Sequence, residues 1–331
     1  MVAPALSATP LPSEAVSPAI GSAAGSSRRG RWRGAGAPWA FLAPAIVLFV
    51  AFLAAPIGYT LYLSLRSSKV SGLGLGLGSR REVWAGLENY RQALSDPDFL
   101  SSVGRVALYG LLLVPTMMGL ALLFALLLDS SRSRATGFSR ISIFLPYAVP
   151  AVIASLLWGF LYLPDVSPFV FVLQKFGITA PDVLSSGGIL FAVANIALWG
   201  GTGFNMIVLY TSLKAIPADL SEAAMIDGAS EVQIAWRIKI PMVMPSLVMT
   251  FIFSLIATLQ VFAEPMTLKP LTNTISSTWT PLMKVYRDAF TRNDIYSAAA
   301  TSVIIALATI ALSFGFLKLV GRRAFTQESG R

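Results

Sequence analysis

Residues 222–241 read EAAMIDGASEVQIAWRIKIP, a moderately polar stretch between two long apolar runs. A polar segment that joins two membrane-length apolar segments must lie at a face of the membrane. Its residues predict a helix, a turn and a second helix: Gly228 stands where a left-handed residue ends the first helix, and Ser230 can cap the second. We expect Pro217 to open the first helix and Pro241 to lead into the next apolar run.

The composition is that of a membrane protein. The 331 residues are 55% hydrophobic and 12% charged, with a mean hydropathy of +0.69, whereas soluble domains carry about 25% charged residues. The chain has no cysteine and no histidine, which removes disulfides, His-based acid–base catalysis and most transition-metal sites. We therefore expect no cofactor, no metal and no catalytic activity in this chain.

Six stretches without Asp, Glu, Lys or Arg are long enough to cross a bilayer as helices, which takes about 20 residues each. They are residues 34–65, 106–128, 141–164, 183–213, 240–263 and 295–317. The sequence thus predicts an all-α, polytopic membrane domain of six transmembrane helices over residues 38–323. Residues 1–37, whose first 27 are rich in Pro, Ala and Ser, are predicted to be a disordered tail, and residues 324–331 a short second tail.

Six spans place both termini on one side, and the distribution of Lys and Arg predicts the side. With cytoplasmic termini, the inner segments hold 14 of the 25 basic residues against seven acids, and the outer segments hold 11 against nine. The short 129–140 loop, with three arginines, is the clearest sign. This topology puts the 222–241 stretch in the cytoplasm.

The 222–241 stretch resembles the coupling loop, or EAA motif, of permease subunits of binding-protein-dependent ATP-binding-cassette importers. The positions that match the family pattern are Glu222, Ala223, Ala224, Asp227, Gly228, Ala229, Trp236 and Pro241. Further stretches are similar to the carbohydrate-type branch, which includes maltose-type and glycerol-phosphate-type importers. They are residues 42–56, 145–158, 209–217 and 286–300. The 61–65 segment and the outer loop at residues 66–86 look more like the first of the two partner permeases.

The resemblance implies the type I permease fold and a function in uptake across a bacterial inner membrane. It implies four kinds of partner: a second, homologous permease, two ATPase subunits, an external solute-binding protein and the lipid bilayer, with no nucleic acid. The coupling loop would extend over about residues 217–241, and the ATPase would dock on Glu222, Ala223, Ala224, Asp227, Gly228 and Ala229. The chain has no nucleotide-binding motif, so ATP hydrolysis would belong to the partner.

Polar and aromatic side chains within the spans indicate a solute path, because polar groups are costly in lipid and usually face the bundle interior. The candidates are Trp199, Phe204, Asn205, Ser254, Thr258, Gln260 and Glu264. Amides and hydroxyls would bind the rims of a sugar and aromatic rings its apolar faces. Ser254 and Thr258 would equally suit helix–helix packing.

Other classes of protein fit less well. A secondary transporter usually carries buried carboxylates, and we find no acid in the middle of a predicted span. The closest alternative is an importer permease for a non-sugar solute, such as glycerol phosphate or a polyamine, followed by an ion-coupled secondary transporter. The Gly-Leu run at residues 72–78 has no assigned role.

Overall fold

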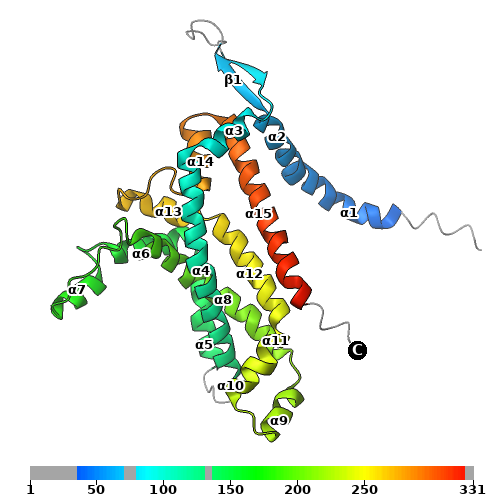
Figure 1. Cartoon of the computed structure of the whole chain (residues 1–331), viewed down its shortest axis with the longest axis vertical. Coiled ribbons are helices and arrows are strands. Elements are labelled where there is room, and N and C mark those ends of the chain that lie inside the picture. The colour runs from blue at the N-terminus through cyan, green and yellow to red at the C-terminus, as the bar shows by residue number, and fades with distance from the viewer. Residues whose placement is uncertain (1–35, 71–79, 131–135, 325–331) are drawn as a thin grey trace, which may run out of the picture. The chain divides into compact units, whose positions relative to one another are not determined.

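The computed structural model describes residues 36–70, 80–130 and 136–324, so most of both predicted tails and the Gly-Leu run lie outside the described residues. The chain forms two compact units, one that ends at Pro56 and one that begins at Ile57. The helices are α1 (Gly36–Phe49), α2 (Ala55–Ser64), α3 (Glu88–Ser95), α4 (Pro97–Asp129), α5 (Thr136–Phe144), α6 (Ala151–Tyr162), α7 (Pro168–Lys175), α8 (Ile189–Lys214), α9 (Ala218–Ile226), α10 (Glu231–Ile234), α11 (Ile240–Met242), α12 (Met244–Leu259), α13 (Ala263–Leu268), α14 (Pro281–Tyr286) and α15 (Ile295–Ala324) (Figure 1).

Five helical stretches are long and apolar enough to cross a membrane, and a bent pair makes a sixth. The five are Phe41–Ser64, Pro97–Asp129, Ile189–Lys214, Met244–Leu271 and Ile295–Leu319. None of the most apolar 18-residue window in Phe41–Ser64 is buried, whereas half of the window in Ile189–Lys214 is buried. The prediction of a helical, polytopic membrane fold is confirmed within the described residues.

The third predicted span is not one helix, which corrects the sequence-based expectation. The Thr136–Ala148 and Ala151–Tyr162 helices meet at an angle of 97°. Val149 lies between them in an extended conformation (φ −81°, ψ 124°), because the ring of Pro150 excludes the residue before it from the helical region. The length of an uncharged stretch predicts a span but carries no information on a bend within it.

A β-hairpin is the one element among the described residues that an all-α fold did not predict. Strand β1 (Arg66–Val70) pairs antiparallel with β2 (Arg80–Trp84), with Arg66 opposite Trp84. Its base is fixed by Asn89, whose amide donates to the carbonyl oxygens of Ser64 (2.8 Å) and Arg66 (2.7 Å). The hydroxyl of Tyr296 on α15 donates to Glu82 (2.7 Å), which ties the hairpin to that helix.

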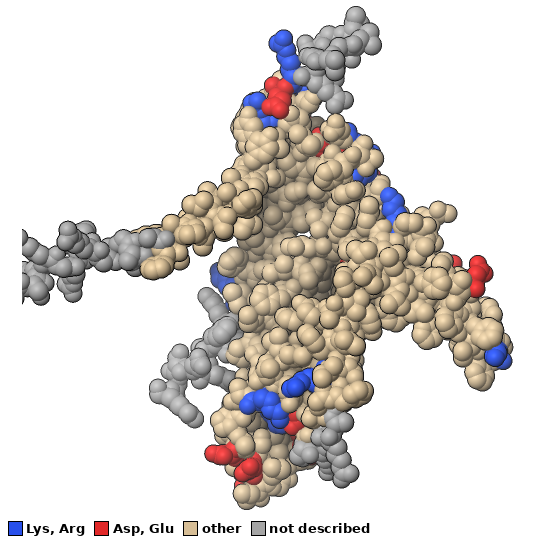
Figure 2. All heavy atoms as spheres, turned by 180° about the vertical axis from the view of Figure 1, so that it is seen from behind, with Lys and Arg blue, Asp and Glu red and all other residues tan. Residues whose placement is uncertain are grey.

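Within the Ile57–Arg331 unit, α4 packs along α8, and α12 packs against both α4 and α15. Small residues let α4 and α8 approach closely: Ala121, Ala125 and Ala192 are at most 1% exposed. Gly203 lets α8 approach α5, since a methyl group there would overlap the backbone of Ile143 and Phe144. On the face in Figure 2, charged residues gather toward the ends of the unit, and the surface between them is mostly uncharged.

Candidate functional site

The predicted coupling loop is a pair of short helices, α9 and α10, joined by a tight turn at one end of the bundle (Figure 1). Gly228 has φ 82°, so the predicted left-handed turn is confirmed. Ser230 caps α10 with a capping box: its hydroxyl accepts from the Gln233 amide nitrogen (3.3 Å), and Gln233 accepts from the Ser230 amide nitrogen (2.8 Å). Pro217 lies one residue before the first residue of α9.

Pro241 leads into the next long apolar helix through a short helix and not directly. A π-helical turn, Ala235–Lys239, continues α10 directly into α11, which contains Pro241. The long apolar helix α12 begins only at Met244. Pro241 is the second residue of α11. Proline is tolerated in the first turn of a helix, because its missing amide hydrogen would have no partner there.

The six predicted docking residues lie on the open surface of this helical pair. Glu222, Ala223, Asp227 and Gly228 are exposed, and Ala224 and Ala229 are half-buried. Of the apolar side chains around them, sequence reasoning singled out Trp236 but not Met225, Ile226 or Val232. Ile226 is 87% exposed, Trp236 69% and Val232 67%, and with Met225 they form what we call the loop patch. A cluster of exposed apolar side chains marks a surface that another protein covers.

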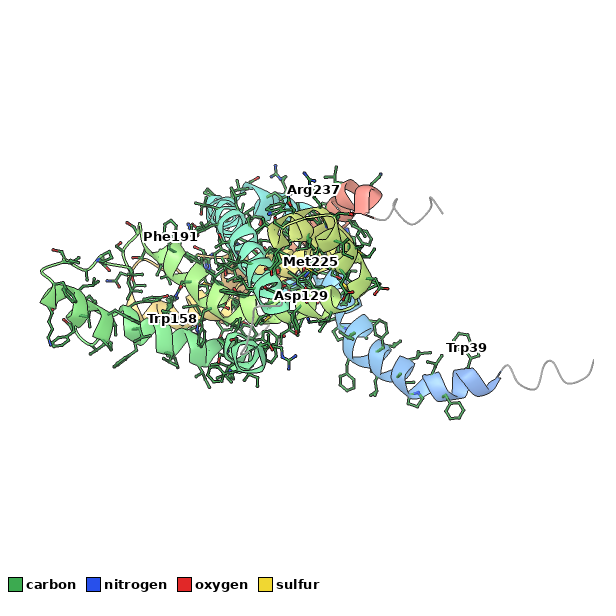
Figure 3. The ribbon with its side chains drawn as sticks, turned by 90° about the horizontal axis from the view of Figure 1, so that it is seen from below. Trp39, Asp129, Trp158, Phe191, Met225 and Arg237 are labelled. Atoms are coloured by element: carbon green, nitrogen blue, oxygen red, sulfur yellow. The ribbon has the colours of Figure 1, made fainter. Side chains whose placement is uncertain are left out.

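Asp129 anchors the helical pair to the long helices. At the end of α4, its carboxylate pairs with Lys214 at the end of α8 (2.8 Å) and with Lys239 of the π-helical turn (2.5 Å). The Asp129 side chain is only 8% exposed, and removing one partner from a buried pair is costly. Figure 3 looks onto this end, with Asp129, Met225 and Arg237 labelled. One carboxylate therefore links the ends of α4 and α8 to the π-helical turn that follows α10.

A groove of about 670 Å³ lies between the helical pair and the ends of α4 and α8. Glu222 and Met225 line it from α9, Trp236 lines it from the π-helical turn, and Asp129 lies on its opposite wall. Glu222 is thus both exposed and directed to the groove, which agrees with its predicted position on a contact surface.

A second cavity, of about 790 Å³, lies between α4, α6, α8, α12 and α13, and we call it the central cavity. Six of the seven predicted path residues line it; they are Phe204, Asn205, Ser254, Thr258, Gln260 and Glu264. Trp199 is not among its lining residues and packs edge-on against Trp158 of α6, with ring centroids 6.0 Å apart. Tyr147, which sequence reasoning missed, stacks on Phe204 at 5.0 Å.

Among the hydrogen bonds of three lining side chains, the one from Ser254 to Asn205 joins α12 to α8, and those to the carbonyl oxygens stay within one helix. The Asn205 amide donates to the carbonyl oxygen of Gly201 (3.0 Å), and its oxygen accepts from Ser254 (3.4 Å). Thr258 donates to the carbonyl oxygen of Ser254 (2.7 Å). All three polar side chains are nearly buried, at 3–6% exposure. Gln260 differs, because it is exposed and ends α12 with its amide at the cavity.

Glu264 also lines the central cavity. The Met244–Leu271 stretch continues through a break at residues 260–262, so this acid lies within it, toward its end. The uncharged stretch that predicted this span ends at residue 263, so Glu264 is the first residue beyond it and does not lie in its middle.

A network of buried ions joins α14 to the start of α4, at the hairpin end of the unit. Lys284 pairs with Asp288 (2.6 Å) and Asp96 (3.2 Å), and Arg287 pairs with Asp288 (2.9 Å) and Asp98 (3.3 Å). Burial acts to raise the pKa of Asp96, but hydrogen bonds from Lys284 and from the Asp98 amide outweigh it and hold that pKa below its usual value. Its stabilising contribution is therefore present at neutral pH and is lost as the pH falls through the lowered pKa.

Comparison with known proteins gives the family. Residues 17–326 match the model of the binding-protein-dependent transport system inner membrane component. The sn-glycerol-3-phosphate transport system permease protein UgpA of Agrobacterium fabrum is 31% identical over 289 residues, which cover 86% of this chain and 95% of that protein. The protein of the same name from Pectobacterium atrosepticum is 29% identical over 302 residues, covering 90% and 98%.

The fold has a solved counterpart in a bacterial ABC transporter involved in the import of the acidic polysaccharide alginate. The TM-score is 0.75, with 18% sequence identity over 88% of this chain and 96% of the other. Members of the family work as a permease pair with ATPases and a solute-binding protein. The chain belongs to the family of inner-membrane components of binding-protein-dependent transport systems.

Proposed function

We propose that this chain is one of the two permease subunits of an ATP-driven importer that carries a sugar or oligosaccharide into a bacterial cytoplasm. The observation that carries the proposal is the α9–α10 pair, which presents an apolar loop patch outside the long helices and is anchored to them through Asp129. Such a surface suits a partner that pushes on the bundle from one side. ATP hydrolysis belongs to that partner and not to this chain.

We place the docking of the ATPase on the residues around the turn between α9 and α10. Glu222, Ala223 and Ala224 give α9 a slim face for close packing, and Asp227, Gly228 and Ala229 form the turn. The termini are then cytoplasmic, on the side of the α9–α10 pair. The excess of Lys and Arg in the segments on that side supports this orientation.

The central cavity is the part of the solute path that this subunit contributes. Its lining combines hydroxyl and amide groups with the stacked rings of Tyr147 and Phe204, and these are the groups that hold a sugar by its rim and its apolar face. The relatives are named for sn-glycerol 3-phosphate, which makes a phosphorylated polyol the second candidate solute. Trp199 contributes by supporting α6 through Trp158.

Replacing Gln260 with leucine should weaken solute transfer without harming the fold. Gln260 is exposed at the cavity, so a lost hydrogen bond to solute costs about 1 kcal/mol, or about fivefold in the half-saturating concentration for uptake. Asn205→Leu is the comparison, because it also removes the bonds to Gly201 and Ser254 and should lower the melting temperature as well. Equal uptake by wild type and Gln260→Leu would remove Gln260 from the path.

The proposed function is tested by reconstitution in liposomes. The purified chain alone should show no ATP-driven uptake, whereas the complex with the second permease, the ATPase subunits and the loaded binding protein should accumulate solute. Uptake that is driven by ATP in liposomes with this chain as their sole protein would contradict the proposal. So would uptake by the chain alone that follows a proton or sodium gradient, since that is the property of a secondary transporter.

A further inference from the structure

The central cavity carries a single formal charge. Its lining side chains are apolar or neutral and polar, apart from Glu264, and none of them is a lysine or an arginine. Within a protein interior, a lone charge acts on a ligand far more strongly than it would in water, because the effective dielectric constant is much lower. The sign of this charge therefore bears directly on which solutes can pass.

Glu264 has no counter-ion within the described residues. No lysine or arginine there forms an ion pair with it, and no other side chain there donates a hydrogen bond to it. Other acids at the ends of the spans are neutralised: Asp129 by Lys214 and Lys239, and Asp288 by Lys284 and Arg287. The buried carboxylates of Asp129 and Asp288 are thus paired, and among the described residues the carboxylate at the cavity has no ion pair.

The position of Glu264 agrees with a role toward solute. It stands in the first turn of α13, just after the break that follows Gln260, so the helix is interrupted where the two polar side chains line the cavity. Residues with polar or charged side chains inside a membrane-spanning stretch are costly and mark transport pathways by default. A packing role would require a partner on a neighbouring helix, and among the described residues no other side chain pairs with Glu264.

Resting on the function proposed above, we infer that Glu264 sets the charge class of the solute. The importer carries an uncharged, polyhydroxylated solute, whose hydroxyl groups donate to the Glu264 carboxylate. An anionic solute, such as a phosphate ester or a uronate, meets an unpaired negative charge in a cavity whose described lining holds no cation. This separates the chain from relatives that are named for the anion sn-glycerol 3-phosphate.

The test begins with the solute itself. The cognate binding protein is purified from its native cells, and the solute released on denaturation is identified by mass spectrometry. That solute is then used in uptake by the complete importer in liposomes, with sn-glycerol 3-phosphate in tenfold excess as the anionic competitor. An uncharged, polyhydroxylated solute whose uptake the competitor leaves unchanged is the expected result. A phosphate ester or uronate that wild type imports would overturn the inference.

Variants then address the residue. Glu264→Lys should lower uptake of the neutral solute at least tenfold and relieve the exclusion of sn-glycerol 3-phosphate, so that the competitor now inhibits. Glu264→Gln keeps the shape and should raise the half-saturating concentration about fivefold. Glu88→Gln, which alters an exposed acid at the hairpin end, is the matched control and should behave as wild type. If uptake and competition are unchanged in Glu264→Lys, a group other than Glu264 selects the charge of the solute.

The two proposals fail in different ways. If the wild-type complex imports no solute at the expense of ATP, the proposed function falls and the role of Glu264 falls with it. If wild type imports solute but Glu264→Lys is indistinguishable from it, the permease function stands and only the role of Glu264 is wrong.

Discussion

Gly228→Val should abolish the coupling of ATP hydrolysis to transport while the protein still inserts and assembles in the membrane. Gly228 has φ 82°, and no atom lies within 4 Å of the place where a side chain would begin. The strain of a side chain in a left-handed conformation is about 1–2 kcal/mol, which is too little to unfold the bundle. The added isopropyl group projects into the surface on which we place the ATPase.

The expected loss is at least tenfold in ATP hydrolysis stimulated by the loaded binding protein, with a parallel loss of uptake. The chain offers a matched control in Gly177, which also has a positive φ (71°) and open space around it but lies at the end of α7. Gly177→Val carries the same kind of strain and should retain coupling. Glu222→Ala should show a milder defect than Gly228→Val, because a polar contact is lost while α9 remains. Full coupling in Gly228→Val would refute the proposed role of the turn.

Asp288→Ala should be the most destabilising of the substitutions considered. Asp288 is 2% exposed and receives both Lys284 and Arg287, and Lys284 is itself 3% exposed. Removing one member of a buried ion pair leaves an uncompensated charge and typically costs about 3–5 kcal/mol. Lys284 would keep only its contact with Asp96, at 3.2 Å.

The measurement is the melting temperature of the purified protein in detergent, at one detergent and salt concentration. Glu88→Ala is the control, since Glu88 pairs with Arg91 at the surface, and exposed pairs contribute about 0–1 kcal/mol. A fall in melting temperature for Asp288→Ala no larger than for Glu88→Ala would show that the network contributes little to stability.

The local features of the coupling loop could be predicted because they depend on neighbours in the sequence. A glycine between two helical stretches implies a left-handed turn, and a serine three residues before a glutamine implies a cap, whatever the rest of the fold does. Gly228 and Ser230 follow these rules. The long apolar helices could also be located from the sequence, because each contains a continuous run of uncharged residues.

What could not be predicted depends on contacts between distant segments. The hairpin depends on pairing across a loop and on Tyr296 of α15, and the Asp129 anchor joins three helices whose separation in sequence hides the contact. Trp199 and Gln260 both looked suitable for a sugar, yet the packing of α6 against α8 takes Trp199 away from the cavity. Substrate roles for the other path residues stay predictions.

Site-directed crosslinking tests the central claim most directly. The chain has no native cysteine, so a single cysteine can be placed without further changes. Ile226→Cys, at 87% exposure in the loop patch, should crosslink to an ATPase subunit in the assembled complex, and the yield should change between ATP-bound and nucleotide-free states. Lys69→Cys, on the hairpin at the opposite end, should give no crosslink to the ATPase. Crosslinking of the ATPase through Lys69→Cys and not through Ile226→Cys would contradict the account.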